Sequence, residues 1–76
     1  MPTLLIYQDY RFFFYANDHP PMHVHVVKAG KWAKIELGSM RVVYSSFKSS
    51  EMRVVRMLLA RHQNEFQEAW NDWIQR

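Results

Sequence analysis

Two consecutive prolines, Pro20 and Pro21, constrain the fold of this chain most, because they exclude helix from the segment around them. Proline lacks the backbone N–H that a helix interior needs, and it also restricts the residue before it. Asn17 and Asp18, which favour turns, lie just upstream. We therefore expect a stiff, extended bend here, with an aromatic segment before it and an alternating segment after it.

The segments on both sides of the bend have the residue pattern of β-strands. Residues 10–15 are aromatic and β-favouring, which predicts a strand with buried surface on both faces. Residues 23–27 and 32–37 alternate in polarity and predict the two strands of a hairpin. Residues 40–44 predict a further strand. The sequence therefore favours a small antiparallel sheet of three to four strands.

After the strands, apolar residues recur at spacings of three and four, which indicates an amphipathic helix. Ser49 or Ser50 is expected to cap its start through the side-chain oxygen. Asn64 followed by Gln67 is typical of a second helix start, so a break near residues 61–64 would divide the helix in two. The fold class is thus α+β, with the sheet packed against C-terminal helix. The apolar stripe consists of Met52, Val55, Leu58, Leu59, His62, Phe66, Ala69, Trp70 and Trp73.

The length of the chain makes a partner plausible, because 76 residues are near the size where one core gives only marginal stability. Hydrophobic residues make up 49% of the chain, which predicts one compact domain over residues 1–76. The apolar stripe of the helix is expected to form the core or a homodimer interface. The absence of cysteine excludes disulfides and thiolate zinc sites. We expect a cytoplasmic protein without membrane contact, since no apolar run reaches membrane-spanning length and the amino end lacks an export signal.

Three of the four histidines fall within seven residues, and this cluster is the strongest chemical signal in the sequence. They are His19, His23 and His25, and Asp18 directly precedes the first. On a strand, His23 and His25 point to the same face, about 7 Å apart. One hypothesis is that the three histidines bind zinc or another metal that prefers imidazole, with Asp18 or water as the fourth ligand.

A two-residue turn at residues 29–30 would give each hairpin histidine a charged neighbour across the strands. The predicted pairs are Val27 with Trp32, His25 with Lys34, and His23 with Glu36. A carboxylate orients a histidine ring and assists proton transfer, so His23, His25 and Glu36 are candidate catalytic residues. Lys34 could neutralise a phosphate. A longer turn would shift this register and remove the pairing with Glu36.

Between residues 28 and 61, basic side chains outnumber acidic ones eight to two, which favours an anionic partner. The leading hypothesis is that the hairpin binds RNA or a cognate small protein, with Trp32 stacking and Lys31, Lys34 and Arg41 holding phosphate. The alternatives are a metal-independent ribonuclease, a metal-binding protein, and histidines that only hydrogen-bond around the bend. Whether the chain is an enzyme stays open, and the absence of the usual motifs predicts no cofactor.

Several segments also carry a family resemblance. The aromatic strand ends in Tyr15-Ala16-Asn17-Asp18-His19, the two prolines follow, and His23-Val24-His25-Val26 comes next. With Met1-Pro2-Thr3, Ala33-Lys34-Ile35 and the long final helix, they resemble the small bacterial proteins of domain of unknown function 4160. In the usual family form one residue separates the histidine from the prolines. Because members are commonly encoded beside another small protein, the resemblance implies a component of a toxin–antitoxin-like module with an RNA or protein partner.

Overall fold

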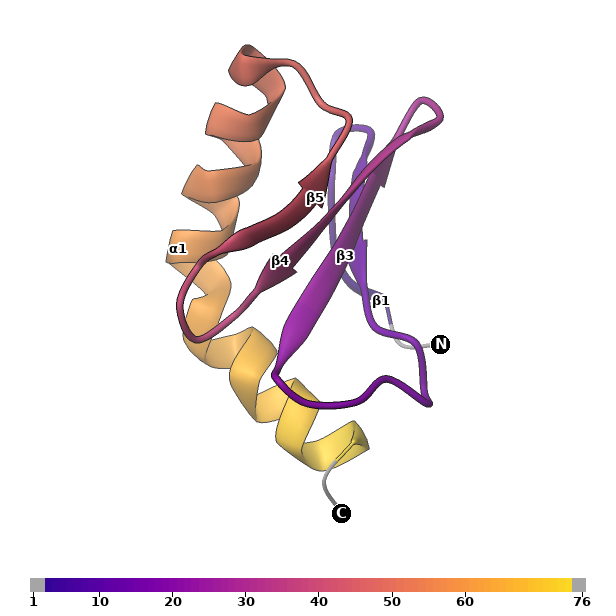
Figure 1. Cartoon of the computed structure of the whole chain (residues 1–76), viewed down its shortest axis with the longest axis vertical. Helices are drawn as coiled ribbons and strands as arrows, with labels where there is room; N and C mark the ends of the chain where they lie inside the picture. The colour runs from indigo at the N-terminus through magenta and orange to yellow at the C-terminus, as the bar shows by residue number, and fades with distance from the viewer. Residues whose placement is uncertain (1–2, 75–76) are drawn as a thin grey trace.

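The computed structural model describes residues 3–74, which form a five-stranded antiparallel sheet and one long helix (Figure 1). The strands lie side by side in chain order, as β1 Thr3–Tyr7, β2 Tyr10–Phe13, β3 His23–Lys28, β4 Lys31–Glu36 and β5 Val42–Ser45. Helix α1, Ser49–Trp73, returns along one face of the sheet. The α+β class and the order of strands before helix are confirmed. No helix in this part of the chain is long and apolar enough to cross a membrane.

The sheet has five strands, so the predicted number of three to four is wrong. The additional strand is β1, which pairs with β2 through Ile6 opposite Arg11 and Tyr7 opposite Tyr10. Its apolar residues are consecutive, and a bulge interrupts its register, so the sequence there has no period of two. An edge strand of this kind is held by its neighbour, and its own residue pattern does not reveal it.

Helix α1 is continuous, so the predicted break near residues 61–64 is wrong. Leu59 and Phe66 flank that segment, and both are buried in the same core. An unbroken helix keeps both side chains on one stripe. Gln63, inside the segment, donates a hydrogen bond to the backbone carbonyl of Leu37 just beyond β4. Packing and this contact favour continuous helix over the local start signal.

The helix begins after Lys48, so the predicted cap by Ser49 or Ser50 is also wrong. Oε1 of Glu51 accepts a hydrogen bond of 2.9 Å from the backbone N–H of Lys48. A glutamate at the third helical position commonly reaches back in this way, and its charge suits the positive end of the helix dipole. The start of α1 is therefore fixed by a carboxylate within its first turn.

The hydrophobic core lies between α1 and the face of the sheet that the helix covers, which we call the covered face. Alternate sheet residues and one stripe of the helix supply the buried side chains. They include Phe12, Val24, Val26, Ala33 and Ile35 from the strands, Phe14 and Leu37 directly after β2 and β4, and Val55, Leu58, Leu59, Phe66 and Trp70 from the helix. Trp70, whose expected role was core or partner contact, is fully buried, whereas Trp73 is half exposed.

The opposite face of the sheet, which we call the open face, has no helix over it in the described part of the chain (Figure 1). It bears the other set of alternate residues, as the strand register requires. They include Ile6, Arg11, Phe13, Tyr15, His23, His25, Val27, Trp32, Lys34, Glu36 and Tyr44. Both of the hairpin histidines and most of the predicted binding residues are therefore on the open face.

The hairpin of β3 and β4 has the predicted two-residue turn, at Ala29 and Gly30, with Lys28 opposite Lys31. Both turn residues have positive φ, 50° for Ala29 and 79° for Gly30, as the tight turns that match strand twist require. The predicted cross-strand pairs are confirmed, and they are Val27 with Trp32, His25 with Lys34, and His23 with Glu36.

Candidate functional site

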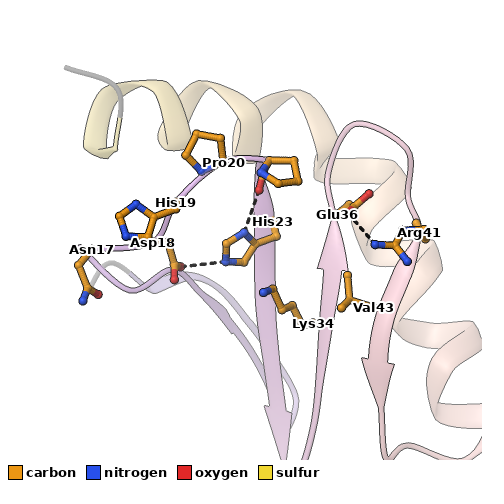
Figure 2. Close-up of a pocket in the computed structure, with 10 residues that line it drawn as sticks. Asn17, Asp18, His19, Pro20, His23, Lys34, Glu36, Arg41 and Val43 are labelled. Atoms are coloured by element: carbon orange, nitrogen blue, oxygen red, sulfur yellow. Dashed lines mark hydrogen bonds and ion pairs between the residues drawn. The ribbon is translucent and has the colours of Figure 1, made fainter.

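The candidate site begins in the bend between β2 and β3. Tyr15 and Asp18 close this bend with two hydrogen bonds: the N–H of Asp18 donates to the Tyr15 carbonyl, and the N–H of Tyr15 donates to Oδ2 of Asp18 at 2.9 Å. The second bond turns the carboxylate of Asp18 inward, toward the start of β3 (Figure 2). The Pro20–Pro21 peptide bond, which is cis, lies between Asp18 and β3 in the sequence.

His23 is held between the bend and the core. Its Nδ1 lies 2.9 Å from the carbonyl oxygen of Pro21, and its Nε2 lies 3.3 Å from Oδ2 of Asp18 (Figure 2). A carbonyl oxygen only accepts, so Nδ1 carries a hydrogen, and Nε2 is the ring nitrogen that faces the carboxylate. The ring packs at 5.1 Å from that of Trp70, and the residue is only 5% exposed.

His25 approaches the same carboxylate from the open face. Its Nε2 lies 3.3 Å from Oδ2 of Asp18, but it has no aligned hydrogen-bond partner among residues 3–74 and is buried. The ring stacks on Phe13 with 5.5 Å between centroids. Burial lowers the pKa of His25, and the neighbouring His23 and Lys34 act in the same direction, against Asp18. Burial thus favours the neutral form of the His25 imidazole.

Asp18, His23 and His25 together offer three donor atoms within 4.8 Å of one another, and we call them the Asp–His cluster. One carboxylate oxygen and two imidazole nitrogens are ligands that divalent transition metals accept. His19, the third histidine of the predicted metal set, is exposed, and its ring lies away from His23 (Figure 2). The structure thus brings two of the predicted histidines together, with Asp18 in the place of His19.

Glu36 lies opposite His23 in the hairpin, but its carboxylate is bound elsewhere. Arg41 donates to Oε2 of Glu36 at 3.0 Å (Figure 2), and Ser39 donates to Oε1 at 2.9 Å. These hydrogen bonds hold the pKa of Glu36 below its usual value. The carboxylate in contact with the histidines is therefore that of Asp18, and the predicted catalytic set His23, His25 and Glu36 is not brought into mutual contact.

The predicted phosphate-binding cations differ in whether their charge is already paired. Arg41 pairs with Glu36, and Nζ of Lys31 lies 3.0 Å from Oε1 of Glu51 at the start of α1. Lys34 forms no ion pair with any residue from 3 to 74. It lines a cavity of about 440 Å³ whose wall also includes Asp18 and His23 (Figure 2). Of the predicted cations, Lys34 is therefore the one whose charge is most available.

A second cavity on the open face has aromatic walls, and we call it the aromatic pocket. Tyr15 and Trp32, both nearly half exposed, line it together with Phe13 and His25. The ring of Trp32 is in turn 4.4 Å from that of Tyr44, which is 46% exposed. The full lining consists of Phe13, Tyr15, His25, Val27, Gly30, Lys31 and Trp32.

Sequence reasoning missed four residues of this surface, namely Arg11, Phe13, Tyr15 and Tyr44. The guanidinium of Arg11 lies 5.1 Å from the ring centre of Phe13, and Tyr15 meets the same ring edge-on at 5.3 Å. A signal for three of them was present, because Arg11, Phe13 and Tyr15 alternate with the core residues of β2. The consecutive aromatic residues hid this alternation, since both faces of the strand are apolar.

The fold and the site define a class of small α+β protein: an antiparallel sheet with a helix on one face, aromatic side chains on the other, and an Asp–His cluster at the bend. Residues 9–71 match the family described as Domain of unknown function (DUF4160), and the chain belongs to this family. No curated protein and no solved structure matches the chain.

Proposed function

We propose that this protein binds single-stranded RNA through the open face of its sheet. The observation that carries the proposal is the concentration of aromatic rings and unpaired cations on the one sheet face that α1 leaves uncovered. Sheet surfaces that bear aromatic side chains stack unpaired bases in other RNA-binding domains. The argument has a stacking part and an electrostatic part.

The stacking part rests on three rings. Tyr15, Trp32 and Tyr44 are each between 43% and 46% exposed, although burial of such rings is normally favourable. Tyr15 and Trp32 stand on the aromatic pocket, and Tyr44 extends the surface from Trp32 toward the edge of the sheet. Bases stack on aromatic side chains with about 1–3 kcal/mol each, largely independent of sequence. The open face therefore offers a path for more than one base.

The electrostatic part rests on two cations. Neither Arg11 nor Lys34 forms an ion pair with a described residue, and both lie on the open face. Arg11 lies over the ring of Phe13, next to the aromatic pocket, and Lys34 lies on β4 between Trp32 and Glu36. Cations beside stacking rings can contact the phosphates of a strand whose bases lie on those rings. The net charge of +3 adds a general attraction.

A protein partner is the main alternative occupant of the open face. Aromatic residues and arginine also favour protein interfaces. RNA is favoured here because Arg11 and Lys34 form no ion pair with a described residue, and because Tyr15, Trp32 and Tyr44 present half-exposed flat rings. If a cognate protein covers the open face instead, RNA affinity will be weak and insensitive to salt.

The test is fluorescence anisotropy with a labelled single-stranded RNA of mixed sequence, about 12 nucleotides long, which is within the site size of comparable domains. We expect binding that weakens between about 50 and 200 mM salt. The substitution Lys34→Ala should weaken binding and lower the slope of log affinity against log salt by about 1. The matched control is Arg61→Ala, which removes one exposed positive charge from α1, away from the open face.

Equal losses for Lys34→Ala and Arg61→Ala would contradict the proposal, because they would indicate attraction by net charge alone. Cleavage of the probe, lost in His23→Gln and His25→Gln, would instead support the metal-independent ribonuclease hypothesis. We also propose, from the family resemblance, that the protein is one component of a toxin–antitoxin-like module. The proteins that copurify with it in its native host test this part separately.

A further inference from the structure

We propose that Asp18, His23 and His25 form a binding site for one divalent transition-metal ion of the zinc class. This inference goes beyond RNA binding and does not depend on it. It rests on the arrangement of the three donor atoms, on the hydrogen bond behind one of the rings, and on the unsatisfied polar atom of the other.

The distances in the Asp–His cluster suit a metal ion. Two ligand atoms that bind zinc at about 2.0–2.1 Å with a tetrahedral angle lie about 3.3–3.4 Å apart. The two nitrogen-to-oxygen distances, from Oδ2 of Asp18 to Nε2 of His23 and to Nε2 of His25, are both 3.3 Å. All three donor atoms lie within 4.8 Å of one another. An ion between them would require little movement of the side chains.

The hydrogen bond of His23 prepares its ring for a metal. Histidine ligands usually donate their second N–H to a carbonyl or carboxylate oxygen, which fixes the tautomer and the ring orientation. Nδ1 of His23 is 2.9 Å from the carbonyl oxygen of Pro21 and has this role. Nε2 is therefore the nitrogen that faces Oδ2 of Asp18, in the position of a metal ligand.

A proton on His23 would satisfy only part of the cluster. Nε2 of His25 is buried and has no hydrogen-bond partner among the described residues, and such atoms are rare because burial without a partner is costly. A proton on His23 leaves that atom unsatisfied. A metal ion would contact Oδ2 of Asp18 and both Nε2 atoms at once, so it accounts for all three.

Three protein ligands leave further coordination positions to water or to another molecule. Asp18 and His23 line the cavity that also holds Lys34, Glu36 and Arg41, so the open side of the site faces a polar wall with two basic groups. Soft thiolate ligands are excluded, since the chain has no cysteine. Two imidazoles and one carboxylate suit Zn²⁺, Co²⁺, Ni²⁺ and Fe²⁺ better than Mg²⁺ or Ca²⁺.

The experiment titrates the untagged, metal-free full chain with Zn²⁺ by calorimetry and with Co²⁺ by visible absorption. We expect one equivalent to bind, with cobalt bands typical of nitrogen and oxygen ligands. Asp18→Asn keeps the shape of the side chain but removes its charge, and His25→Gln removes the unsatisfied nitrogen. Each should weaken metal binding by more than the roughly 10- to 100-fold that loss of an outer hydrogen-bond partner costs.

His19→Ala and His62→Gln are the matched controls, since each removes a histidine outside the cluster. Affinity unchanged in Asp18→Asn and His25→Gln, or lost in His19→Ala, would overturn the site. A wild-type chain that binds neither metal would overturn it as well. Because variants can misfold, nitrogen NMR of the wild-type histidines provides a second measurement. Zn²⁺ should shift Nε2 of His23 and His25 and leave His62 unchanged; a shift at His62 alone would reject the inference.

Discussion

The two faces of the sheet use the same strands but differ in what their side chains do. On the covered face, alternate residues such as Phe12, Val24 and Ile35 are buried under α1, and they are all apolar. On the open face, most of the intervening residues are aromatic, basic or histidine, and several stay half exposed. Because the register fixes both sets together, every core residue that is correctly placed also places a neighbour on the open face.

If the proposed RNA binding is correct, this difference separates folding stability from binding. Changes on the covered face should lower the free energy of unfolding, whereas changes on the open face should lower affinity for RNA with little effect on folding. His23 is one exception, because it is 5% exposed and contacts Trp70 although it belongs to the open face, and Phe13 is another, at 3% exposed. Phe13 is covered by Arg11, Tyr15 and His25, whose side chains form the surface above it.

The largest expected effect is that of Trp70→Ala on the covered face. Trp70 is fully buried against Phe14 and His23, so its truncation should lower the free energy of unfolding by about 3–5 kcal/mol. A domain of this size has only about 4–11 kcal/mol in total. Urea denaturation measures the loss. Trp70→Phe should cost less, because Nε1 of Trp70 is buried without a partner in the described region. Equal losses for the two variants would argue against this account of the core.

Trp32→Ala is the corresponding change on the open face. It should weaken binding of the single-stranded RNA probe by about 1–3 kcal/mol, the usual contribution of one stacked base, and cost about 1 kcal/mol of stability or less. Met57→Ala is the control, because Met57 is 44% exposed on α1, away from the open face. If Trp32→Ala unfolds the protein as Trp70→Ala does, the contrast between the faces is wrong.

A smaller effect is expected at the two-residue turn that joins β3 and β4. Ala29 has φ of 50°, a conformation that costs a residue with a Cβ atom about 1–2 kcal/mol, whereas asparagine before glycine is favoured in such turns. Ala29→Asn should therefore raise the free energy of unfolding by about 1 kcal/mol and leave RNA affinity unchanged. The same substitution at Ala60, in the exposed part of α1, should lower stability. A loss of RNA affinity in Ala29→Asn would show that the turn itself contacts the ligand.

The smallest expected effect concerns Glu51, which connects the start of α1 to Lys28 and Lys31 of the hairpin. The backbone N–H of Lys48 and the ammonium groups of Lys31 and Lys28 lower the pKa of Glu51 from 4.5 to about 2. A lowered pKa in the folded state means that this contribution to stability is present above pH 4.5 and is lost as the pH falls from about 4.5 to about 2. Melting temperatures across that window should fall more steeply for the wild type than for Glu51→Gln. Parallel profiles would show that the contacts of Glu51 contribute nothing.

Most of the sheet and the helix could be predicted because their periodicity is strong. The register of β3 against β4 followed from one glycine and two alternating segments, and the long stripe of apolar residues identified α1. The edge strand β1 could not be found, because it depends on pairing with β2 and has little pattern of its own. The continuity of α1 likewise depends on burial of Leu59 and Phe66 in one core, which a local signal at Asn64 does not reflect.

The candidate site was predictable in its place but not in its contacts. Two histidines on one strand face were evident from the spacing of His23 and His25. Asp18 lies closer to these histidines than Glu36 does because of how the bend folds back. The periodicity of the sequence carries no information about this folding. That Lys31 pairs with Glu51 depends on where the helix begins relative to the hairpin tip. Such contacts between distant segments are set by tertiary packing.

The two-residue turn at Ala29 and Gly30 also limits how this sequence can change over evolution. One residue inserted there would either bulge out or exchange the two faces of one strand relative to its partner, moving valines into water and histidines into the core. Relatives should therefore vary little in the length of this turn. The segment between β4 and β5 has no such parity to preserve, so changes in length should accumulate there, and a peptide tag is best inserted there. The bend before β3 must instead keep Asp18 within reach of His23 and His25.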